Sequence, residues 1–126
     1  MRQELDELSS NLIEDINKSG IHDSNSNYIR FNNGKAIAWG NASFYVSGFA
    51  ALGNIFYFEV GGLSLWLPIT FTSLMIIPTV NWTSSGGCLQ IQPQSNGSAI
   101  TTIFGLCPTT EAKTVSFNYI AIGIWK

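Results

Sequence analysis

The chain has 126 residues, the size of one domain, and its hydrophobic content of 45% is enough to build a single core. Its formal net charge is −2 and it has no basic cluster, so the positive surface of a nucleic-acid-binding protein is missing. Charged residues make up 11% of the sequence, against about a quarter in ordinary soluble domains. A body this poor in charge predicts that part of its surface is covered, and copies of the same chain are the expected cover.

Residues 1–19 carry the pattern of an amphipathic helix. Apolar residues at spacings of four, three, four and four form one stripe, and acidic residues fill the other faces: Met1, Leu5, Leu8, Leu12 and Ile16. A helix this short is marginal alone in water, so a coiled-coil shaft with copies of the same chain is predicted, held by Leu5, Leu8, Leu12 and Ile16. Lys18 and Gly20 supply a basic last turn and a glycine stop. The polar, turn-prone residues 20–27 are expected to form a neck linker.

From residue 28 onward, short β-rich runs alternate with Gly, Asn, Ser and Pro. Strands are expected near Tyr28–Phe31, Lys35–Gly40, Ser43–Val46, Ile55–Val60, Ser64–Thr70, Leu74–Val80, Cys88–Gln92, Ile100–Phe104 and Val115–Trp125. Asn33-Gly34 predicts a two-residue hairpin with a type I′ turn. The runs Leu74–Val80 and Ile120–Ile124 are apolar on both faces, which predicts cover on both sides. The expected fold of residues 28–126 is all-β, an antiparallel, jelly-roll-like β-sandwich head preceded by the helical shaft.

Residues 60–110 contain no Asp, Glu, Lys, Arg or His, and the part from Gly61 to Val80 is as long as a membrane-spanning helix. Pro68 and Pro78 interrupt it, and its Thr, Ser and β-branched residues favour strands. No membrane insertion is therefore expected. Residues 1–8 are acidic and polar, unlike a secretory signal, so the chain is expected to be made in the cytoplasm.

The sequence offers few groups for catalysis. His22 is the single histidine, and Glu59 and Glu111 are the only carboxylates after residue 27, so no acid and base pair is expected. The Gly-Gly pairs do not precede a helix, which excludes a phosphate-binding loop. We expect no enzymatic activity and no cofactor. No metal site is expected either, the alternative being three copies of His22 meeting on a trimer axis.

Two cysteines, Cys88 and Cys107, are too few for a disulfide scaffold or a set of metal ligands. Two interpretations stay open. The thiols are buried as small hydrophobic groups, or they form a bridge between neighbouring strands.

A receptor site is hypothesised on two polar loops, 83–87 and 93–98, and on the side chains beside them. Their Gly, Ser and Asn give backbone freedom, and their amides and hydroxyls both donate and accept hydrogen bonds, which suits neutral sugars. The candidate residues are Trp82, Thr83, Ser84, Ser85, Gln90, Gln92, Gln94 and Asn96. The same loops are equally consistent with ordinary hairpin connections, and Trp82 with core packing. The loop 47–53 is the next candidate.

Three segments together resemble the carboxy-terminal domains of tail-fibre proteins from tailed phages and prophages. Phe31–Gly40 (FNNGKAIAWG) is similar to their opening, an aromatic residue or proline followed by Gly, apolar residues and Trp-Gly. Trp66–Phe71 (WLPITF) resembles their Phe-Pro-Ile-x-Phe strand, with Trp-Leu in place of the leading Phe. Phe117–Trp125 (FNYIAIGIW) is similar to their closing strand, an aromatic residue before Ile-Ala-Ile-Gly. The likeness spans about four fifths of the chain.

The resemblance implies a trimeric β-sandwich fibre tip in the virion that recognises a bacterial surface receptor, often a polysaccharide. Its expected partners are copies of itself, a surface glycan or protein of the host, and other tail or baseplate proteins. The shared motifs mark framework strands, so no binding residue follows from them, and specificity is expected in residues 47–62 and 83–113. The alternative is a structural trimerisation or capping module that contacts only virion proteins.

Overall fold

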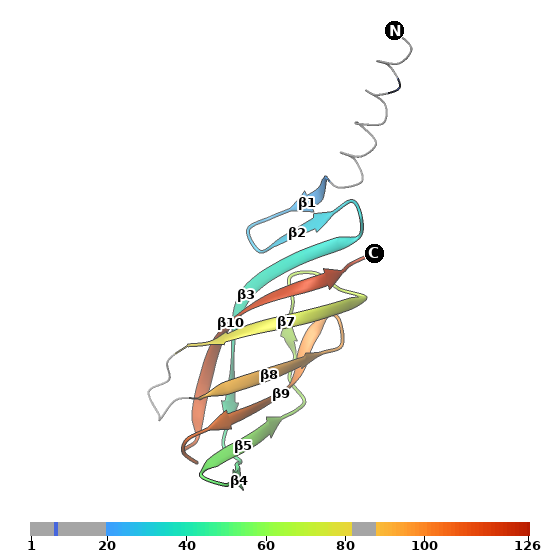
Figure 1. Ribbon diagram of the computed structural model, residues 1–126. Coiled ribbons are helices and arrows are strands. Elements are labelled where there is room, and N and C mark those ends of the chain that lie inside the picture. The colour runs from blue at the N-terminus through green and yellow to red at the C-terminus, as the bar shows by residue number, and fades with distance from the viewer. Residues whose placement is uncertain (1–6, 8–19, 82–87) are drawn as a thin grey trace.

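The computed structural model describes residues 7, 20–81 and 88–126. Within these ranges the chain forms ten strands in two antiparallel sheets, which confirms the all-β class and the two-sheet architecture (Figure 1). The proposed trimerisation stripe, with Leu5, Leu8, Leu12 and Ile16, lies outside the described residues. So do four of the candidate receptor residues: Trp82, Thr83, Ser84 and Ser85.

The first sheet has the strand order β1-β2-β3-β10-β7. Its members are β1 (Ile21–Ser24), β2 (Tyr28–Phe31), β3 (Lys35–Val46), β10 (Lys113–Ile124) and β7 (Ser73–Val80). The two longest strands, β3 and β10, pair along their whole length, from Lys113 opposite Val46 to Ile124 opposite Lys35. β7 pairs with residues Phe117 to Ile124 of β10 on its other edge. This long central pair is the framework of the molecule.

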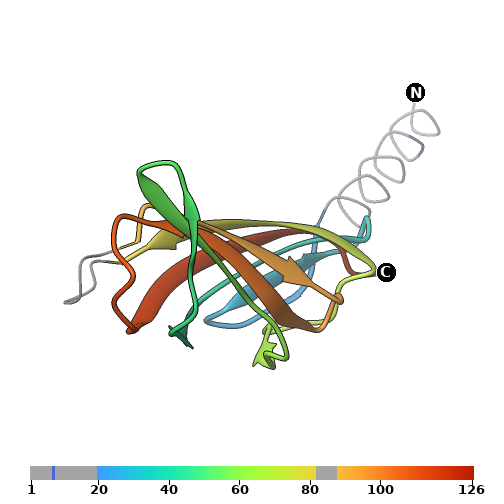
Figure 2. The same cartoon turned by 90° about the horizontal axis from the view of Figure 1, so that it is seen from below.

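The second sheet is built around β9 (Ala99–Cys107). Its other members are β4 (Ala50–Leu52), β5 (Ile55–Val60), β6 (Leu65–Trp66) and β8 (Gln90–Ser95). Because Phe104 pairs with both Glu59 and Gln92, β5 and β8 lie on opposite edges of β9. β6 pairs with β9 beyond the end of β5. Strands of the two sheets cross each other in the second view (Figure 2), and the edge strands β7 and β8 lie next to each other (Figure 1).

The core lies between the sheets, where the inward side chains of their strands meet. In β10 every second residue is buried from Lys113 to Ala121, as the period of two in a strand requires. Phe44 connects the layers, because its ring centroid lies 5.7 Å from that of Phe58 and 6.0 Å from that of Phe117. The largest side chains with almost no exposed surface are Phe58, Phe117, Ile100, Ile103, Val46 and Val115.

Several segments differ from the sequence-based expectation. β8 runs over Gln90–Ser95 instead of Cys88–Gln92, so the first half of the candidate loop 93–98 belongs to a strand. Lys35–Val46 is one strand instead of two, Leu65–Trp66 is all that remains of the strand expected over Ser64–Thr70, and β4 was not expected. Part of the expected neck linker is a strand, because β1 pairs with β2. The polar residues of this linker are used locally: the Arg30 guanidinium pairs with the Asp23 carboxylate, and the Asn25 side-chain oxygen accepts hydrogen bonds from two backbone amides.

The turn between β2 and β3 also differs from the prediction. Within this turn only Gly34 has a positive φ, of 92°. A type I′ turn needs a positive φ at both central residues, so the prediction of that turn type is wrong. The Gly34 amide donates to the Phe31 carbonyl at 3.1 Å, which makes a three-residue loop of Asn32, Asn33 and Gly34. A three-residue loop with glycine in the left-handed region is the next commonest hairpin connection.

Two glycines of the tail-fibre-like motifs have clear packing reasons. A Cβ on Gly40 would lie 2.8 Å from the hydroxyl oxygen of Tyr119, which is its partner across β3 and β10. A Cβ on Gly123 would lie 2.0 Å from the Ser73 carbonyl oxygen, so β7 approaches β10 more closely there than a side chain allows. Gly123 is therefore required for contact between the strand backbones, whereas Gly40 leaves room for the end of the Tyr119 side chain.

The C-terminal tryptophan closes the sheet end beside β2. The Trp125 backbone amide donates to the Gly34 carbonyl at 2.9 Å, and its indole N–H donates to the Phe31 carbonyl at 3.0 Å. The Arg30 guanidinium carbon lies 4.9 Å from the indole centroid, and the His22 ring lies against the same indole at 4.9 Å. Charged and aromatic side chains thus hold the amino-terminal hairpin to the end of β10.

No helix within residues 20–81 and 88–126 is long and apolar enough to cross a membrane. No group of three or more His, Cys, Asp and Glu side chains in those ranges is placed to hold a metal ion.

Candidate functional site

The three candidate glutamines of β8 share one exposed face. Gln90, Gln92 and Gln94 alternate along the strand with residues that face the other way, and all three side chains are exposed. Ile91 lies between the first two and is only 4% exposed, so it points into the core. The strand period of two therefore places the glutamine row on the outer face of the second sheet.

Aromatic and aliphatic side chains of the neighbouring strands complete this face. In register with Gln90 lie Leu106 of β9 and Tyr57 of β5. In register with Gln92 lie Phe104 and then Glu59. Tyr57 is 45% exposed, while Phe104 and Leu106 are half-buried. The result is two cross-strand rows, each with an apolar side chain in the middle and a glutamine at one end.

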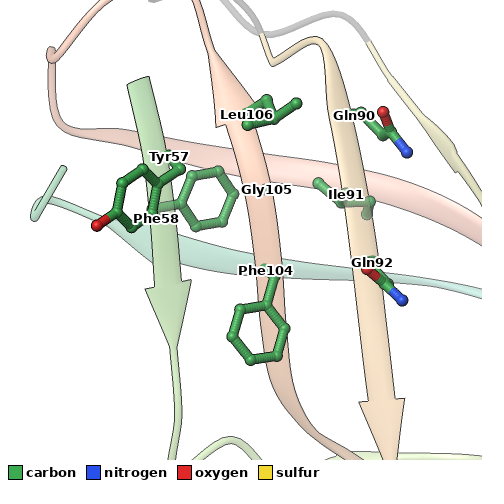
Figure 3. Close-up of a pocket in the computed structure, with 8 residues that line it drawn as sticks. All are labelled: Tyr57, Phe58, Gln90, Ile91, Gln92, Phe104, Gly105 and Leu106. Carbon is green, nitrogen blue, oxygen red and sulfur yellow. The ribbon is translucent and has the colours of Figure 1, made fainter. Parts of the chain in front are cut away.

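A hollow of about 270 Å³ lies on these three strands. Its lining residues are Tyr57, Phe58, Gln90, Ile91, Gln92, Phe104, Gly105 and Leu106, which Figure 3 shows on β5, β9 and β8. The inward row of Phe58, Gly105 and Ile91 runs between the two outward rows. Gly105 makes this packing possible, because a Cβ there would lie 2.2 Å from the Phe58 ring.

Trp66 extends the same face along β9. Leu65 packs against the core, so the next side chain in β6 points outward, and Trp66 is 73% exposed. Trp66 pairs with Ala99, five residues along β9 from Phe104, which corresponds to roughly 16 Å of strand. Sequence reasoning assigned Trp66 to a framework strand and did not select Tyr57 or Phe104. The alternation of residues along β5, β6 and β9 indicates which side chains lie on the same face of the sheet, but it does not indicate which face is buried.

We refer to the outward side chains of Tyr57, Glu59, Gln90, Gln92, Gln94 and Phe104, with the hollow between them, as the glutamine face. Glu59 is the only charged member of this set. Aromatic rings present apolar surfaces to a ligand, and primary amides both donate and accept hydrogen bonds. This combination suits a ligand that has apolar patches and many hydroxyl groups.

The candidate residue Asn96 has a structural role. Its side-chain oxygen accepts hydrogen bonds from the backbone amides of Ser98 at 2.9 Å and Ala99 at 3.0 Å. The neighbouring Gly97 is buried, with φ of 99°, and its carbonyl accepts a hydrogen bond from the Phe71 amide at 2.8 Å. Residues 96–99 therefore form a tight hairpin turn that is bonded to the segment before β7. Asn96 lies directly after β8, and its side-chain oxygen is used by the two backbone amides of the turn.

The two cysteines lie beside one end of the glutamine face. Both are free thiols, Cys107 being buried at the end of β9 and Cys88 half-buried before β8. Burial, together with the adjacent Cys107 thiol, raises the pKa of Cys88 to about 12. The Cys88 thiol is therefore held in its neutral form at ordinary pH.

The segment 47–53, the next candidate after the two polar loops, leads into the hairpin of β4 and β5. Its aromatic residue is used for packing, since Phe49 contacts the Phe58 ring at a centroid distance of 6.0 Å. The Lys113 ammonium group lies 5.4 Å from the Phe49 ring centroid. Leu52 is 53% exposed in the same hairpin.

Comparison with known proteins identifies no relative of this chain. No family model matches the chain, and neither a curated protein nor a solved structure matches it. The resemblance to tail-fibre domains therefore rests on the three sequence motifs themselves.

Proposed function

We propose that the chain is the receptor-binding tip of a phage tail fibre, a trimeric adhesin whose glutamine face binds a neutral polysaccharide of the host surface. The observation that carries the binding part is the hollow of about 270 Å³ with Tyr57 and Phe104 beside Gln90 and Gln92. The three motifs support the tail-fibre part. The jelly-roll-like detail of the head, the helical shaft and the location in the virion belong to the same proposal.

The chemistry of the face fits a sugar ring in two ways. The C–H side of a pyranose is apolar and packs on an aromatic ring, as other apolar surfaces do. The hydroxyl groups at its edge pair with glutamine amides, which supply donors and acceptors from one side chain. The hollow is slightly smaller than ordinary ligand pockets, which begin at about 300 Å³, so it has room for about one sugar unit.

Three copies of a weak site are enough for firm attachment to a polymer. Once one site is bound, the others meet the same polysaccharide at a high effective concentration, and overall avidity rises by about 10² to 10⁴. An exposed and shallow face is suited to this mode because each contact forms and breaks readily. The partners in this proposal are the surface glycan, the other copies, and the tail or baseplate proteins that carry the fibre.

The test is binding of the purified chain to intact cells and to isolated surface polysaccharide from a panel of bacteria. Gln90→Ala with Gln92→Ala removes both amides beside the hollow and is expected to weaken cell binding at least tenfold, with an unchanged melting temperature. Asn54→Ala, an exposed amide in the turn between β4 and β5, is the matched control and is expected to bind like the parent.

Three outcomes would contradict the proposal. If the double variant keeps its melting temperature and binds as the parent does, the glutamine face is not the receptor site. If the parent binds no cell or glycan but is retained by other virion proteins, the chain is a structural capping module. Release of reducing sugar from host polysaccharide, abolished by Glu59→Gln or Glu111→Gln, would replace binding by hydrolysis.

A further inference from the structure

The outer face of the first sheet carries in-register rows of apolar side chains. Ile122 in β10 pairs with Ile37 of β3 on one side and Met75 of β7 on the other, and Ile29 of β2 continues this row. The next row consists of Trp39, Ile120 and Ile77. We call these residues, together with Ile124, the isoleucine face. It crosses four strands of the sheet on the side away from the core.

Much of this surface is open in the single chain. The exposed fractions of its most open members lie between 41% and 61%: Met75, Ile77, Ile120, Ile122 and Ile124. Their combined exposed area is on the order of 400 Å², within the range of the largest apolar patch on a typical monomer. A broad surface hollow of about 530 Å³ lies over part of the face and is lined in part by Ile37, Ile122 and Ile124.

The border of the isoleucine face is polar and almost uncharged. Continuing along the same strands, Asn118 pairs with Asn41 and with Thr79, and Ser116 pairs with Ser43. Lys35, opposite Ile124, is the one charged residue among the outward positions of β3, β10 and β7. Two such faces can therefore meet without appreciable repulsion between like charges.

From this arrangement we infer that copies of this chain pack on one another through the isoleucine face. A standard interface buries about 800 Å² on each partner, with an apolar centre and a polar rim, and interfaces between identical chains have the more apolar centres. The isoleucine rows supply the centre, and the Asn, Ser and Thr rows supply one side of the rim. This interface adds to the proposed function the surface through which the copies associate. It depends on that proposal only for the number of copies.

The other candidate cover is the apolar stripe of residues 1–19 from the same chain. The four strands that carry the face span about 15 Å between the outermost backbones, whereas a helix with its side chains is about 10–12 Å wide. One helix would leave part of the two rows open. The sheet faces of other copies have matching width and present side chains at the same strand spacing.

Assembly through this face leaves the glutamine face free. The two faces are the outer surfaces of opposite sheets, so covering one does not cover the other. Copies that meet through their first sheets therefore present several glutamine faces outward at once. This arrangement is what a multivalent adhesin needs.

The full-length chain is the material for the test, and its mass is measured by light scattering and sedimentation across concentration. Ile122→Glu places a carboxylate at the centre of the face and is expected to raise the dissociation constant at least 100-fold, because the charge would be buried without a partner. Met75→Lys, at an edge strand and 61% exposed, is the second variant and decides the result if Ile122→Glu does not fold. Leu52→Glu, also an exposed leucine-sized side chain but on the second sheet, is the control and is expected to associate like the parent.

A photo-reactive p-benzoylphenylalanine at Met75 identifies the cover directly. Crosslinks to residues of β3, β7 or β10 in another copy are expected. A monomeric parent at tens of micromolar, unchanged association of both folded variants, or crosslinks to residues 1–19 of the same chain would each overturn the inference. Since the readout is mass and crosslinks, it stays separate from glycan binding, which can fail or succeed independently.

Discussion

At the scale of single residues, the close contacts of the fold explain why particular small side chains occur where they do. Gly105 lets the Phe58 ring lie against β9, and Gly123 lets β7 approach β10. The alternation of buried and exposed residues in β10 matches its sequence from Val115 to Tyr119, where apolar residues alternate with Ser and Asn. Neither glycine could be assigned a contact beforehand, because the contact partner is distant in sequence and is fixed only by the register of the strands.

Cys88 provides a prediction at this scale. Its pKa is raised from 9.0 to about 12, so the thiol is neutral in the folded chain where the unfolded chain ionises. The contribution of the neutral Cys88 thiol to the free energy of unfolding is fully present below about pH 9 and is lost as pH rises toward 12. The raised pKa of the buried Tyr119 acts in the same direction. We expect the melting temperature to fall from pH 8 to pH 11, and to fall less steeply in Cys88→Ala.

Thiol reactivity checks the same assignment independently. Because the thiolate is the reactive form, alkylation of Cys88 by iodoacetamide at pH 8.5 is expected to be at least about 100-fold slower in the folded chain than in urea. Equal rates in the two states, followed by mass spectrometry of the Cys88 peptide, would show that this thiol is not protected.

At the scale of elements, the sequence predicted most strands but not how they continue or join. β2, β5 and β7 lie within a residue of their expected bounds, because each is a compact apolar run. The break expected after Gly40 is absent, since Asn41 and Ala42 pair with Asn118 and Phe117 and so continue the ladder. β1 was missed because its residues are polar, and its stability depends on pairing with β2 and on the Asp23 and Arg30 ion pair.

The candidate site was predictable to the same partial extent. Gln90 and Gln92 were expected in a strand and Gln94 in the polar loop 93–98, and the continuation of β8 to Ser95 places all three on one face. Tyr57 and Phe104 come from other strands, and only the pairing of β5, β9 and β8 brings them beside the glutamines. Asn96 was selected for its polarity, yet its oxygen caps the turn.

The β8 to β9 turn gives a prediction at the element scale. Asn96→Ala removes two acceptor contacts to backbone amides and is expected to lower the free energy of unfolding by about 1–2 kcal/mol. Gly97→Ala is expected to cost more, about 3 kcal/mol, because φ is 99° and the new Cβ would lie 2.5 Å from the Phe71 carbonyl oxygen. Chemical denaturation measures both, with the exposed Gln92→Ala, expected near zero, as the reference. The reverse order, or no loss in either variant, would show that the turn does not hold the hairpin.

At the scale of the whole molecule, two sheets share one core and expose two different outer faces. The outer face of the first sheet is aliphatic at its centre, whereas that of the second carries amides and aromatic rings. The charge-poor sequence predicted that some surface is covered, and it indicated the runs Leu74–Val80 and Ile120–Ile124, which are apolar on both faces. It could not predict the neighbours of these runs, and the register now shows that isoleucines of β10 align with apolar side chains of β3 and β7.

A homotrimer in solution is the prediction at this scale. Light scattering at micromolar concentration is expected to give three times the chain mass of 13.8 kDa. Replacing Leu8 and Leu12 by serine is expected to weaken the trimer and to leave the circular dichroism of the β body unchanged, because the stripe contributes to association alone. A monomer mass for the parent would contradict it.

The described body begins and finishes at the same place. The Gly20 carbonyl accepts a hydrogen bond from the Asn32 amide, and Trp125 donates to the Gly34 carbonyl, so both ends are attached to one three-residue loop. β4 and β5 lie at the opposite end of the molecule (Figure 1). Both ends of the described body therefore lie at one end of the molecule, away from β4 and β5. A fluorophore or an immobilisation tag placed after Lys126 is therefore expected to leave Tyr57 and its neighbours unobstructed, which makes surface-tethered binding measurements practicable.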